Sequence, residues 1–467
     1  MKSFLSKITH IFFPVFLLLA FAGNVHANTL KVTRTDDPPP NGCQPNDCSL
    51  REAITAANQD SQTDTIEIPA GWYTIGAGAN DEQNLKGDFD IWVSMDFKGA
   101  GKGKTIIDGE RLDRLFHLHH QNATFKVSFS DLTIAGGNAA NGNGGAIYAE
   151  AGYEVAVKNC RILHNTADLY GGAIYTTDGS LVLENTDLKG NMATKDGGGI
   201  YYADNLGSGQ FKVTGGEFSQ NGSGRAGGAI AVIKGSLGAD SVNFKQNHAG
   251  LYGGAVATLS GSSLTLKNSK ITDNSAFYRG GGLHLEGAAT LLNDEITENE
   301  ADIFGGGFDM VSSGAPINIQ GSVLAGNTSE TGDGPDCEAI AANPLTSVGS
   351  NKFGDLKGCE HTSTESDVTG FNPAKSDVPT PSTPSATPAT PSAQAPCTAD
   401  ASGTNGTQVT AQNQVVGNSS TPASGGGRSC SLTERGLPSS VHLGDFAVIL
   451  AAMALLTGLR RRIHPEK

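Results

Sequence analysis

One local pattern recurs through the middle of this chain: an asparagine followed six residues later by a pair of glycines. Successive asparagines are 25–30 residues apart, whereas their distance to the glycine pair never changes. A fixed motif on a loose period is typical of a solenoid, in which similar units stack and the loops between them vary. The seven asparagines are Asn138, Asn165, Asn191, Asn221, Asn247, Asn274 and Asn299, and the glycine pairs begin at Gly144, Gly171, Gly197, Gly227, Gly253, Gly280 and Gly305.

The two ends of the series are irregular. An eighth half-copy stops at Asn327, with Asp333 where the first glycine should be. In the first copy, Ile134 lies four residues before Asn138, whereas later copies have their apolar residue three before the asparagine. Irregular terminal copies are expected of a repeat array.

The units contain short apolar alternations and no helical period. Residues 180–184 and 262–267 alternate in this way, and Gly, Asn and Asp bound them. The chain has 62 glycines and only 17% charged residues, which disfavours long helices. We therefore predict an all-β fold in which each unit is one coil of a parallel β-helix, with the apolar residue after each glycine pair facing the core.

The repeated asparagines have two interpretations. Their amides can hydrogen-bond from coil to coil as a buried structural ladder, and asparagine tolerates the left-handed backbone of a tight corner. They could instead bind a ligand. We predict the ladder for Asn138, Asn165, Asn191, Asn221, Asn247, Asn274, Asn299 and Asn327.

Aromatic residues flank the glycine pairs. Packing and a carbohydrate-stacking stripe are both open interpretations for them. They are Tyr148, Tyr170, Tyr175, Tyr201, Tyr252, Tyr278 and Phe304.

The combination of Phe/Ile-x-x-Asn with Gly-Gly-Ala-Ile, over residues 130–330, resembles the repeat of chlamydial polymorphic outer-membrane proteins and related bacterial surface β-helices. The resemblance implies a right-handed, pectin-lyase-like β-helix exposed at a cell surface, with adhesion as its usual role. We expect no autotransporter barrel, because a long series of alternating strands of about ten residues is missing.

Residues 28–75 carry a second resemblance. Cys48-Ser-Leu-Arg-Glu-Ala-Ile54 is similar to the CSLREA motif that begins many secreted bacterial β-helix proteins. The residues themselves predict a helix over Leu50–Asn58 with Ser49 as its N-cap, covering the open end of the β-helix. Arg51 and Glu52 on that helix are interpreted as a structural salt link or a solvated face, with catalysis as the alternative.

Residues 1–27 have the pattern of a secretory signal peptide, so we expect export. An exported chain with seven cysteines favours disulfides. Cys43 and Cys48 can close a small loop beside the cap, and Cys337 and Cys359 can staple the other end of the repeats over 76–375. Cys160 lies within a coil and is predicted to be a buried thiol.

The composition changes after the repeats. Residues 376–429 are rich in Pro, Thr, Ser and Gly, and predict a disordered stalk. Residues 430–467 contain Cys430, a mostly apolar stretch over 446–459 and an arginine cluster. This order resembles bacterial C-terminal sorting signals, which implies cleavage or lipid attachment near Cys430. The alternative is a retained C-terminal membrane helix.

Few residues suggest catalysis. Asn185-Thr-Asp187 matches one short piece of the polygalacturonase pattern, but the other pieces are missing. His117, His119 and His120 form the only histidine cluster in the sequence, and a metal site is the alternative to a structural role for them. We predict no catalytic residue, no metal ligand and no cofactor.

Three functional hypotheses remain. The favoured one is a noncatalytic, surface-anchored adhesin that binds a glycan or protein along the side of the coils. The alternatives are a polysaccharide lyase or glycoside hydrolase, and a passive coat component. Convergence of three carboxylates and a basic residue in a groove would favour an enzyme. The net charge of −15 argues against nucleic acid, and we expect a monomer attached to the membrane by its C-terminal segment.

Overall fold

The computed structural model describes residues 27–59, 62–76, 83–119, 124–259, 261–311, 315–332, 334–339 and 345–373. The chain divides into the units Met1–Ser382 and Thr383–Lys467, and every described residue belongs to the first. The predicted signal peptide up to residue 26, His120, and the predicted stalk and tail with Cys430 lie outside the described residues.

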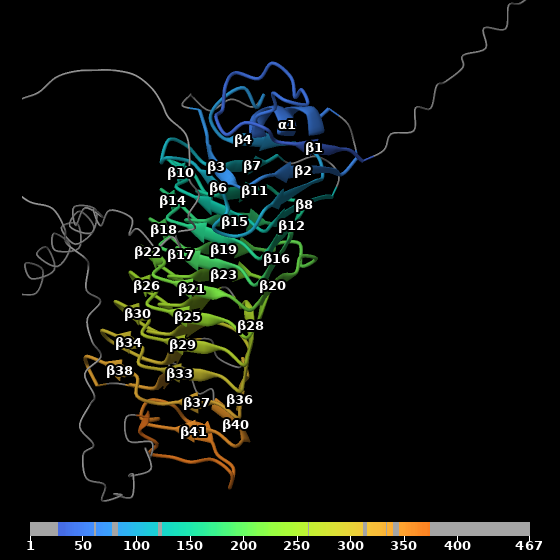
Figure 1. Cartoon of the computed structure of the whole chain (residues 1–467). Coiled ribbons are helices and arrows are strands. Elements are labelled where there is room, and N and C mark those ends of the chain that lie inside the picture. Colours follow the sequence, from blue (N-terminus) through green and yellow to red (C-terminus); the bar gives the residue numbers. More distant parts are fainter. Residues whose placement is uncertain are drawn as a thin grey trace, which may run out of the picture. The chain divides into compact units, whose positions relative to one another are not determined.

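The described chain is a right-handed parallel β-helix, as predicted (Figure 1). Each repeat contributes one short strand to each of four sheets, and all the strand-to-strand pairings are parallel between successive coils. One coil thus passes through the four sheets in a fixed order before the next coil begins, and we number the sheets 1 to 4 in that order. Such stacking places equivalent side chains about 4.8 Å apart along the axis.

Within the described residues, sheets 1 and 2 contain 13 and 11 strands. The strands of sheet 1 are β1 (Thr29–Lys31), β2 (Asp64–Ile68), β5 (Met95–Gly99), β8 (Phe125–Ser130), β12 (Tyr153–Lys158), β16 (Ser180–Glu184), β20 (Phe211–Thr214), β24 (Ser236–Asp240), β28 (Ser263–Lys267), β32 (Ala289–Leu292), β36 (Ile317–Gln320), β40 (Leu345–Gly349) and β42 (His361–Thr362). The strands of sheet 2 are β3 (Gly71–Thr74), β6 (Thr105–Asp108), β9 (Thr133–Ala135), β13 (Arg161–Leu163), β17 (Asp187–Lys189), β21 (Glu217–Ser219), β25 (Asn243–Lys245), β29 (Lys270–Thr272), β33 (Glu295–Thr297), β37 (Val323–Leu324) and β41 (Lys352–Phe353).

Sheets 3 and 4 contain eight and ten strands in the same part of the chain. The strands of sheet 3 are β10 (Asn138–Ala139), β14 (Thr166–Ala167), β18 (Met192–Ala193), β22 (Gly222–Ser223), β26 (His248–Ala249), β30 (Ser275–Ala276), β34 (Glu300–Ala301) and β38 (Thr328–Ser329). The strands of sheet 4 are β4 (Phe89–Ile91), β7 (Phe116–Leu118), β11 (Ile147–Ala149), β15 (Ile174–Thr177), β19 (Ile200–Ala203), β23 (Ile230–Lys234), β27 (Val256–Thr258), β31 (Leu283–Leu285), β35 (Phe308–Met310) and β39 (Cys337–Ala339).

The apolar residue after each glycine pair faces the core. Ile147, Ile174 and Ile200 stack in register on β11, β15 and β19, and all three are fully buried. Burying an aliphatic side chain of this size contributes about 1.5–3 kcal/mol. Because every coil repeats the step, the core is one continuous column of apolar side chains.

The asparagines form a hydrogen-bonded ladder at the corner between sheets 2 and 3. From Asn165 to Asn299, each side-chain Nδ2 donates to Oδ1 of the next asparagine at 2.9–3.0 Å, and the backbone N–H donates to the same oxygen. Asn327 continues the pattern by donating both groups to Oδ1 of Asp336, at 3.0 and 2.9 Å. The ladder therefore ends on a carboxyl group.

Asn138 does not belong to this ladder, so that part of the prediction is wrong. The N–H that donates to Asn165 Oδ1 is that of Gly137, and Asn138 pairs with Thr166 in β10 and β14. The side chain of Asn138 donates instead to the carbonyl of Arg111 and accepts from Thr166. The extra residue between Ile134 and Asn138 shifts the asparagine out of the corner by one position.

The left-handed corner position is also not the asparagine itself. It is the residue before it, as in His164, Gln220 and Gln246, whose φ angles are 54°, 55° and 56°. The asparagine stays in ordinary backbone geometry and uses its side chain for the ladder.

The two glycines of each pair have different roles. The first has positive φ, for example 64° at Gly171, which costs a glycine little. The second lies against the next coil, because a Cβ on Gly172 would be 2.2 Å from the carbonyl oxygen of Gly198. The pair thus allows the turn and the close approach of neighbouring coils.

Helix α1 (Leu50–Ala57) packs against β1, β2 and β4 at the N-terminal end of the coils (Figure 1). Ser49 and Glu52 form a reciprocal capping box: Glu52 N–H donates to Ser49 Oγ and Ser49 N–H to Glu52 Oε2. Arg51 is buried and pairs with Asp37 at 2.7 Å. Arg51 and Glu52 are therefore structural residues. The interpretation that they form a solvated face is wrong.

Two disulfides lie at the ends of the coils. Cys43 is bonded to Cys48 beside the cap, and Cys337 is bonded to Cys359 near the last coils. Cys160 is a buried free thiol, and burial raises its pKa to about 11.

Within the described ranges, no helix has the length and apolar character needed to cross a membrane.

Candidate functional site on sheet 4

The outward-facing central position of sheet 4 forms one row of side chains, which we call the sheet 4 row. The residues in this row are in register from strand to strand. In order along the axis they are Asp90, His117, Tyr148, Tyr175, Tyr201, Ala231, Ala257, His284, Asp309 and Glu338. The row therefore has aromatic residues in its first half and a histidine–carboxylate pair at either end.

Three tyrosines make up the aromatic part. Ring centroids of Tyr148 and Tyr175 are 5.2 Å apart, and those of Tyr175 and Tyr201 are 5.0 Å apart in stacked geometry. Tyr170, from the corner before the glycine pair, packs against Tyr201 at 4.8 Å. All four are half-buried, so part of each side chain reaches solvent. Burial raises the pKa of Tyr175 to about 12, which keeps the phenol neutral at physiological pH.

Cations lie over the edges of this aromatic row. The Arg114 guanidinium is 4.8 Å from the Tyr148 ring centroid, and Lys195 Nζ is 5.0 Å from that of Tyr170. Such contacts are favourable because the face of an aromatic ring carries partial negative charge.

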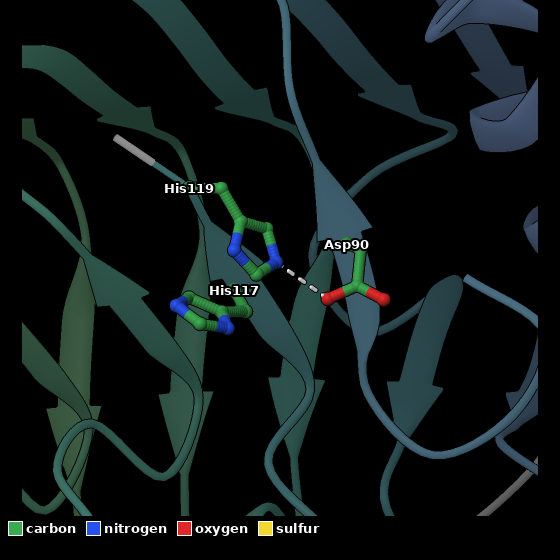
Figure 2. A group of neighbouring side chains, drawn as sticks. All are labelled: Asp90, His117 and His119. Carbon is green, nitrogen blue, oxygen red and sulfur yellow. Dashed lines mark hydrogen bonds and ion pairs between the residues drawn. The ribbon is translucent and has the colours of Figure 1, made fainter. Parts of the chain in front are cut away.

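The N-terminal end of the row brings together Asp90, His117 and His119 (Figure 2). Their ligand atoms all lie within 4.8 Å of one another, and the three side chains are buried. His119 Nε2 is 2.6 Å from Asp90 Oδ1, and the ring centroids of the two histidines are 3.6 Å apart. Strand geometry explains the grouping, since Asp90 pairs with His117 across β4 and β7 and His119 lies two residues further on the same face.

More charged groups adjoin this cluster. Asp88 is fully buried and lies 3.1 Å from Arg114. Burial raises the pKa of Asp88 to about 7 despite this cation, and burial also raises the pKa of Asp113. His117 Nε2 lies 3.1 Å from Glu150 Oε1.

The two histidines differ in their surroundings. Burial, with the charges of His119 and Arg114, lowers the pKa of His117, although Glu150 opposes the change. His117 is therefore neutral at physiological pH. Trp92 stacks on His119 with ring centroids 4.0 Å apart.

The other end of the row holds His284 and Asp309, joined at 2.8 Å. Burial would lower the pKa of His284, but Asp309 and then Glu286 outweigh it and raise the pKa to about 9. Tyr252 covers the His284 ring at a centroid distance of 4.8 Å. This end of the row is thus a buried ion pair.

Three carboxylates and a basic residue do converge, as an enzyme would require. Asp88, Asp90 and Asp113 lie near Arg114, but Asp88 and Asp90 have 0% exposure. A catalytic carboxylate has to come within hydrogen-bonding distance of its substrate. Two of these three carboxylates are therefore buried away from a substrate, and none of the three lines the shallow hollows over sheets 1 and 2.

Asp187, the residue of the polygalacturonase-like motif, lies elsewhere. Asp187 is on sheet 2, where it pairs with Lys102 at 2.9 Å and with Arg161 at 3.8 Å. The shallow hollow over sheet 2 is lined by one further carboxylate, Glu217, whose backbone N–H donates to Asp187 Oδ1 at 3.3 Å. The match to a polygalacturonase motif is thus part of a surface ion-pair network.

Sequence reasoning identified His117 and His119 but missed Asp90 and Arg114. The first two coils lack the Asn-x5-Gly-Gly pattern, so their register with the repeats was not evident. A signal was present, because the triplets Phe-Asp-Ile at 89–91 and Phe-His-Leu at 116–118 have the same alternation as Ile-Tyr-Ala at 147–149. Aligning the three would have placed Asp90, His117 and Tyr148 in one row.

No protein-family model and no curated protein matches the chain. Solved structures are similar at low identity. The A-module of Azotobacter vinelandii mannuronan C-5 epimerase AlgE6 matches with 16% identity and a TM-score of 0.39, over 69% of this chain and 95% of that one. A mannuronic acid specific polysaccharide family 6 lyase from human gut microbiota matches with 10% identity and a TM-score of 0.31, over 72% and 91%. The catalytic domain of a GH87 alpha-1,3-glucanase matches with 14% identity and a TM-score of 0.31, over 72% and 70%. At these values the similarities assign no activity to this chain.

Proposed function

We propose that the protein is an exported glycan-binding protein of the cell surface, and that its binding face is the tyrosine part of the sheet 4 row. The observation that supports this proposal is the in-register stack of Tyr148, Tyr175 and Tyr201, each half-buried. A stack that served the core alone would be covered, as the Ala231–Ala257 part of the same row is.

The chemistry of the stack suits a polysaccharide. A tyrosine offers an apolar ring face and a hydroxyl that can hydrogen-bond, which matches the apolar face and the hydroxyls of a pyranose ring. The coil spacing of about 4.8 Å is close to the length of one sugar unit, so successive tyrosines can contact successive units. A glycan would then lie along the axis of the coils.

Export and surface attachment are supported by the sequence outside the described residues. The signal-like residues 1–27, the stalk over 376–429 and the tail with Cys430 favour a protein presented at the outer face of a membrane. The resemblances to CSLREA-type proteins and to chlamydial polymorphic outer-membrane proteins point the same way. We propose that Cys430 or a neighbouring residue is the attachment point.

A carbohydrate-active enzyme is the second candidate. It is favoured by one observation, the gathering of Asp88, Asp90 and Asp113 with Arg114 at the end of the tyrosine stack. Their burial favours binding without cleavage.

A glycan array probed with the full-length protein tests the proposal. We expect binding to a restricted set of polysaccharides, and we expect the double variant Y175A/Y201A to weaken it about tenfold or more. The matched control is W72A, which removes a 52% exposed aromatic from β3 of sheet 2 and should bind as the wild type does.

The outcomes separate the hypotheses. Equal binding by Y175A/Y201A and the wild type would contradict a tyrosine binding face. If new reducing ends or unsaturated products appear during incubation with the bound polysaccharide, the protein is an enzyme and not a noncatalytic binding protein. A complete lack of glycan binding would leave the coat component as the better description.

A further inference from the structure

The cluster at the N-terminal end of the sheet 4 row carries an inference that is independent of glycan binding. We propose that Asp90, His117 and His119 form a binding site for one divalent transition-metal ion of the zinc type.

The donor set supports a transition metal. Two imidazole nitrogens and one carboxylate oxygen are ligands that Zn²⁺ commonly takes, and three protein ligands leave a fourth position for water. Ca²⁺ and Mg²⁺ prefer sites made of oxygen atoms alone. The two histidines therefore favour zinc and its neighbours in the transition series.

The backbone brings the three ligands together from two adjacent strands. Asp90 on β4 is in register with His117 on β7, and His119 follows on the same face (Figure 2). The ligand atoms lie within 4.8 Å of one another. In a tetrahedral zinc site with bonds of about 2.0–2.1 Å, ligand atoms are roughly 3.4 Å apart. Metal binding therefore has to draw the ligand atoms that are farthest apart together by about 1 Å.

Surrounding groups hold the three side chains in orientation. Asp90 Oδ2 accepts a hydrogen bond from the backbone N–H of Asn84 at 2.8 Å, and Asn84 Oδ1 accepts from the N–H of Asp90 at 3.1 Å. Glu150 lies against the His117 ring nitrogen at 3.1 Å. A carboxylate on the second nitrogen of a metal-binding histidine is a frequent arrangement, because it fixes the tautomer and the ring plane.

Aromatic contacts restrict the rings as well. Trp92 stacks on His119, and Tyr148 stacks on His117 at a centroid distance of 4.8 Å. Ligands held in this way lose little side-chain freedom when a metal binds.

The opposite end of the same row shows what a purely structural pair requires. His284 lies between two carboxylates, Asp309 at 2.8 Å and Glu286 at 3.6 Å, and no second imidazole of the described residues adjoins them in the row. At the N-terminal end, two imidazoles lie 3.6 Å apart, and His119 already occupies the Asp90 carboxylate. His117 has Glu150 on its Nε2 and also lies within 4.8 Å of Asp90 and His119 by its ligand atom. One metal ion can therefore bind Asp90, His117 and His119 together, with Glu150 outside them.

The test is a Zn²⁺ titration of full-length protein that carries no polyhistidine tag and has been stripped of metal by a chelator. Isothermal calorimetry should give one Zn²⁺ per chain, and saturating Zn²⁺ should raise the thermal midpoint. We expect H117Q and D90N to lower the affinity at least about 100-fold and to abolish this rise. The matched control is H284N, which breaks the histidine–carboxylate pair at the other end of the row and should bind Zn²⁺ as the wild type does.

Co²⁺ substitution supplies a readout that does not depend on the variants folding. The wild type should show visible absorption of a nitrogen- and oxygen-ligated ion, without a thiolate charge-transfer band. Equal affinity in the wild type, H117Q and D90N would overturn the site, and so would a lack of saturable binding. A thiolate band would overturn it by assigning the metal to cysteine.

Discussion

Asn221 Nδ2 donates to Oδ1 of Asn247 in the next coil and to the carbonyl oxygen of Leu188 in the preceding coil, both at 3.0 Å. One amide thus joins three successive coils. Its own Oδ1 in turn accepts the backbone N–H and the Nδ2 of Asn191. The buried polar groups at this corner depend on one another.

Replacing one ladder residue should therefore be costly. N221A removes the acceptor for two buried N–H groups of Asn191 and leaves the carbonyl of Leu188 without its side-chain donor. We expect a loss of about 2–4 kcal/mol in the free energy of unfolding, because buried donors lose their partners. Urea unfolding followed by circular dichroism measures the change.

N138A is the matched control, because Asn138 is half-buried and outside the ladder. We expect a change below about 1 kcal/mol for it. Equal effects of the two substitutions would mean that the ladder adds nothing beyond an ordinary asparagine contact.

The second glycine of a pair should not accept a methyl group. G172A would place a Cβ 2.2 Å from the backbone oxygen of Gly198. Because this oxygen belongs to the backbone, it cannot move without shifting the whole neighbouring coil. We expect a destabilisation of about 2–3 kcal/mol from overpacking. G238A serves as the control, since nothing lies within 4 Å of its new methyl group. A thermal melt that shows similar midpoints for both variants would contradict close coil contact at the pair.

Two arginines near the cap, Arg51 and Arg34, should differ in how much their ion pairs stabilise the fold. R51M leaves the carboxylate of Asp37 buried without its partner, since the two side chains are only 1% and 5% exposed. We expect a loss of about 3–5 kcal/mol. R34M removes pairs with Asp36 and Asp47 that water reaches, and it should have little effect. Chemical denaturation of both variants measures whether R51M lowers the free energy of unfolding more than R34M does.

His284 should make stability depend on alkaline pH. Its pKa is about 9 in the folded protein and about 6.5 in an unfolded chain. Because the folded state holds the proton more tightly, this stabilisation is fully present below pH ~6.5 and is lost as the pH rises through about 9. Its size is on the order of 3 kcal/mol at most.

The comparison of wild type and H284Q isolates this histidine. The thermal midpoint of the wild type should fall more than that of H284Q between pH 6.5 and 10, because glutamine does not titrate while Asp309, Glu286 and Tyr252 surround position 284 in both proteins. Parallel pH curves would exclude a stabilising charge on His284.

Much of the fold was predictable because its repeated residues each solve a local problem of the backbone. The Asn-x5-Gly-Gly pattern defined the coil, and the apolar residue after it defined the core face. The prediction that was wrong concerns register, which is the position of a residue relative to the neighbouring coils. Asn138 satisfies the spacing to its glycine pair, but the residue added before it moves the corner to Gly137. Neighbouring coils decide this, and they are not visible in one copy of the motif.

The sheet 4 row was harder to predict, because it is a relation between coils. Tyr148, Tyr175 and Tyr201 were recognised beside the glycine pairs, yet packing and stacking could not be separated without their exposure. Asp90 lies in a coil with no repeat pattern and 27 residues before His117. Only the parallel pairing of β4 with β7 brings the two side chains together.

The asparagine ladder has a direction. In the bonds between asparagine side chains, every amide from Asn165 onward donates toward the C-terminal end, so this column of hydrogen bonds is polarised like a row of aligned dipoles. Asp336 closes it with a group that accepts at one oxygen from Asn327 and at the other from the backbone of Asp355. A duplicated repeat can enter anywhere inside this column and find a donor behind it and an acceptor ahead. Among the described residues no amide continues the column beyond Asp336. This single residue therefore determines where a duplicated repeat fits, which is before Asp336 and not after it.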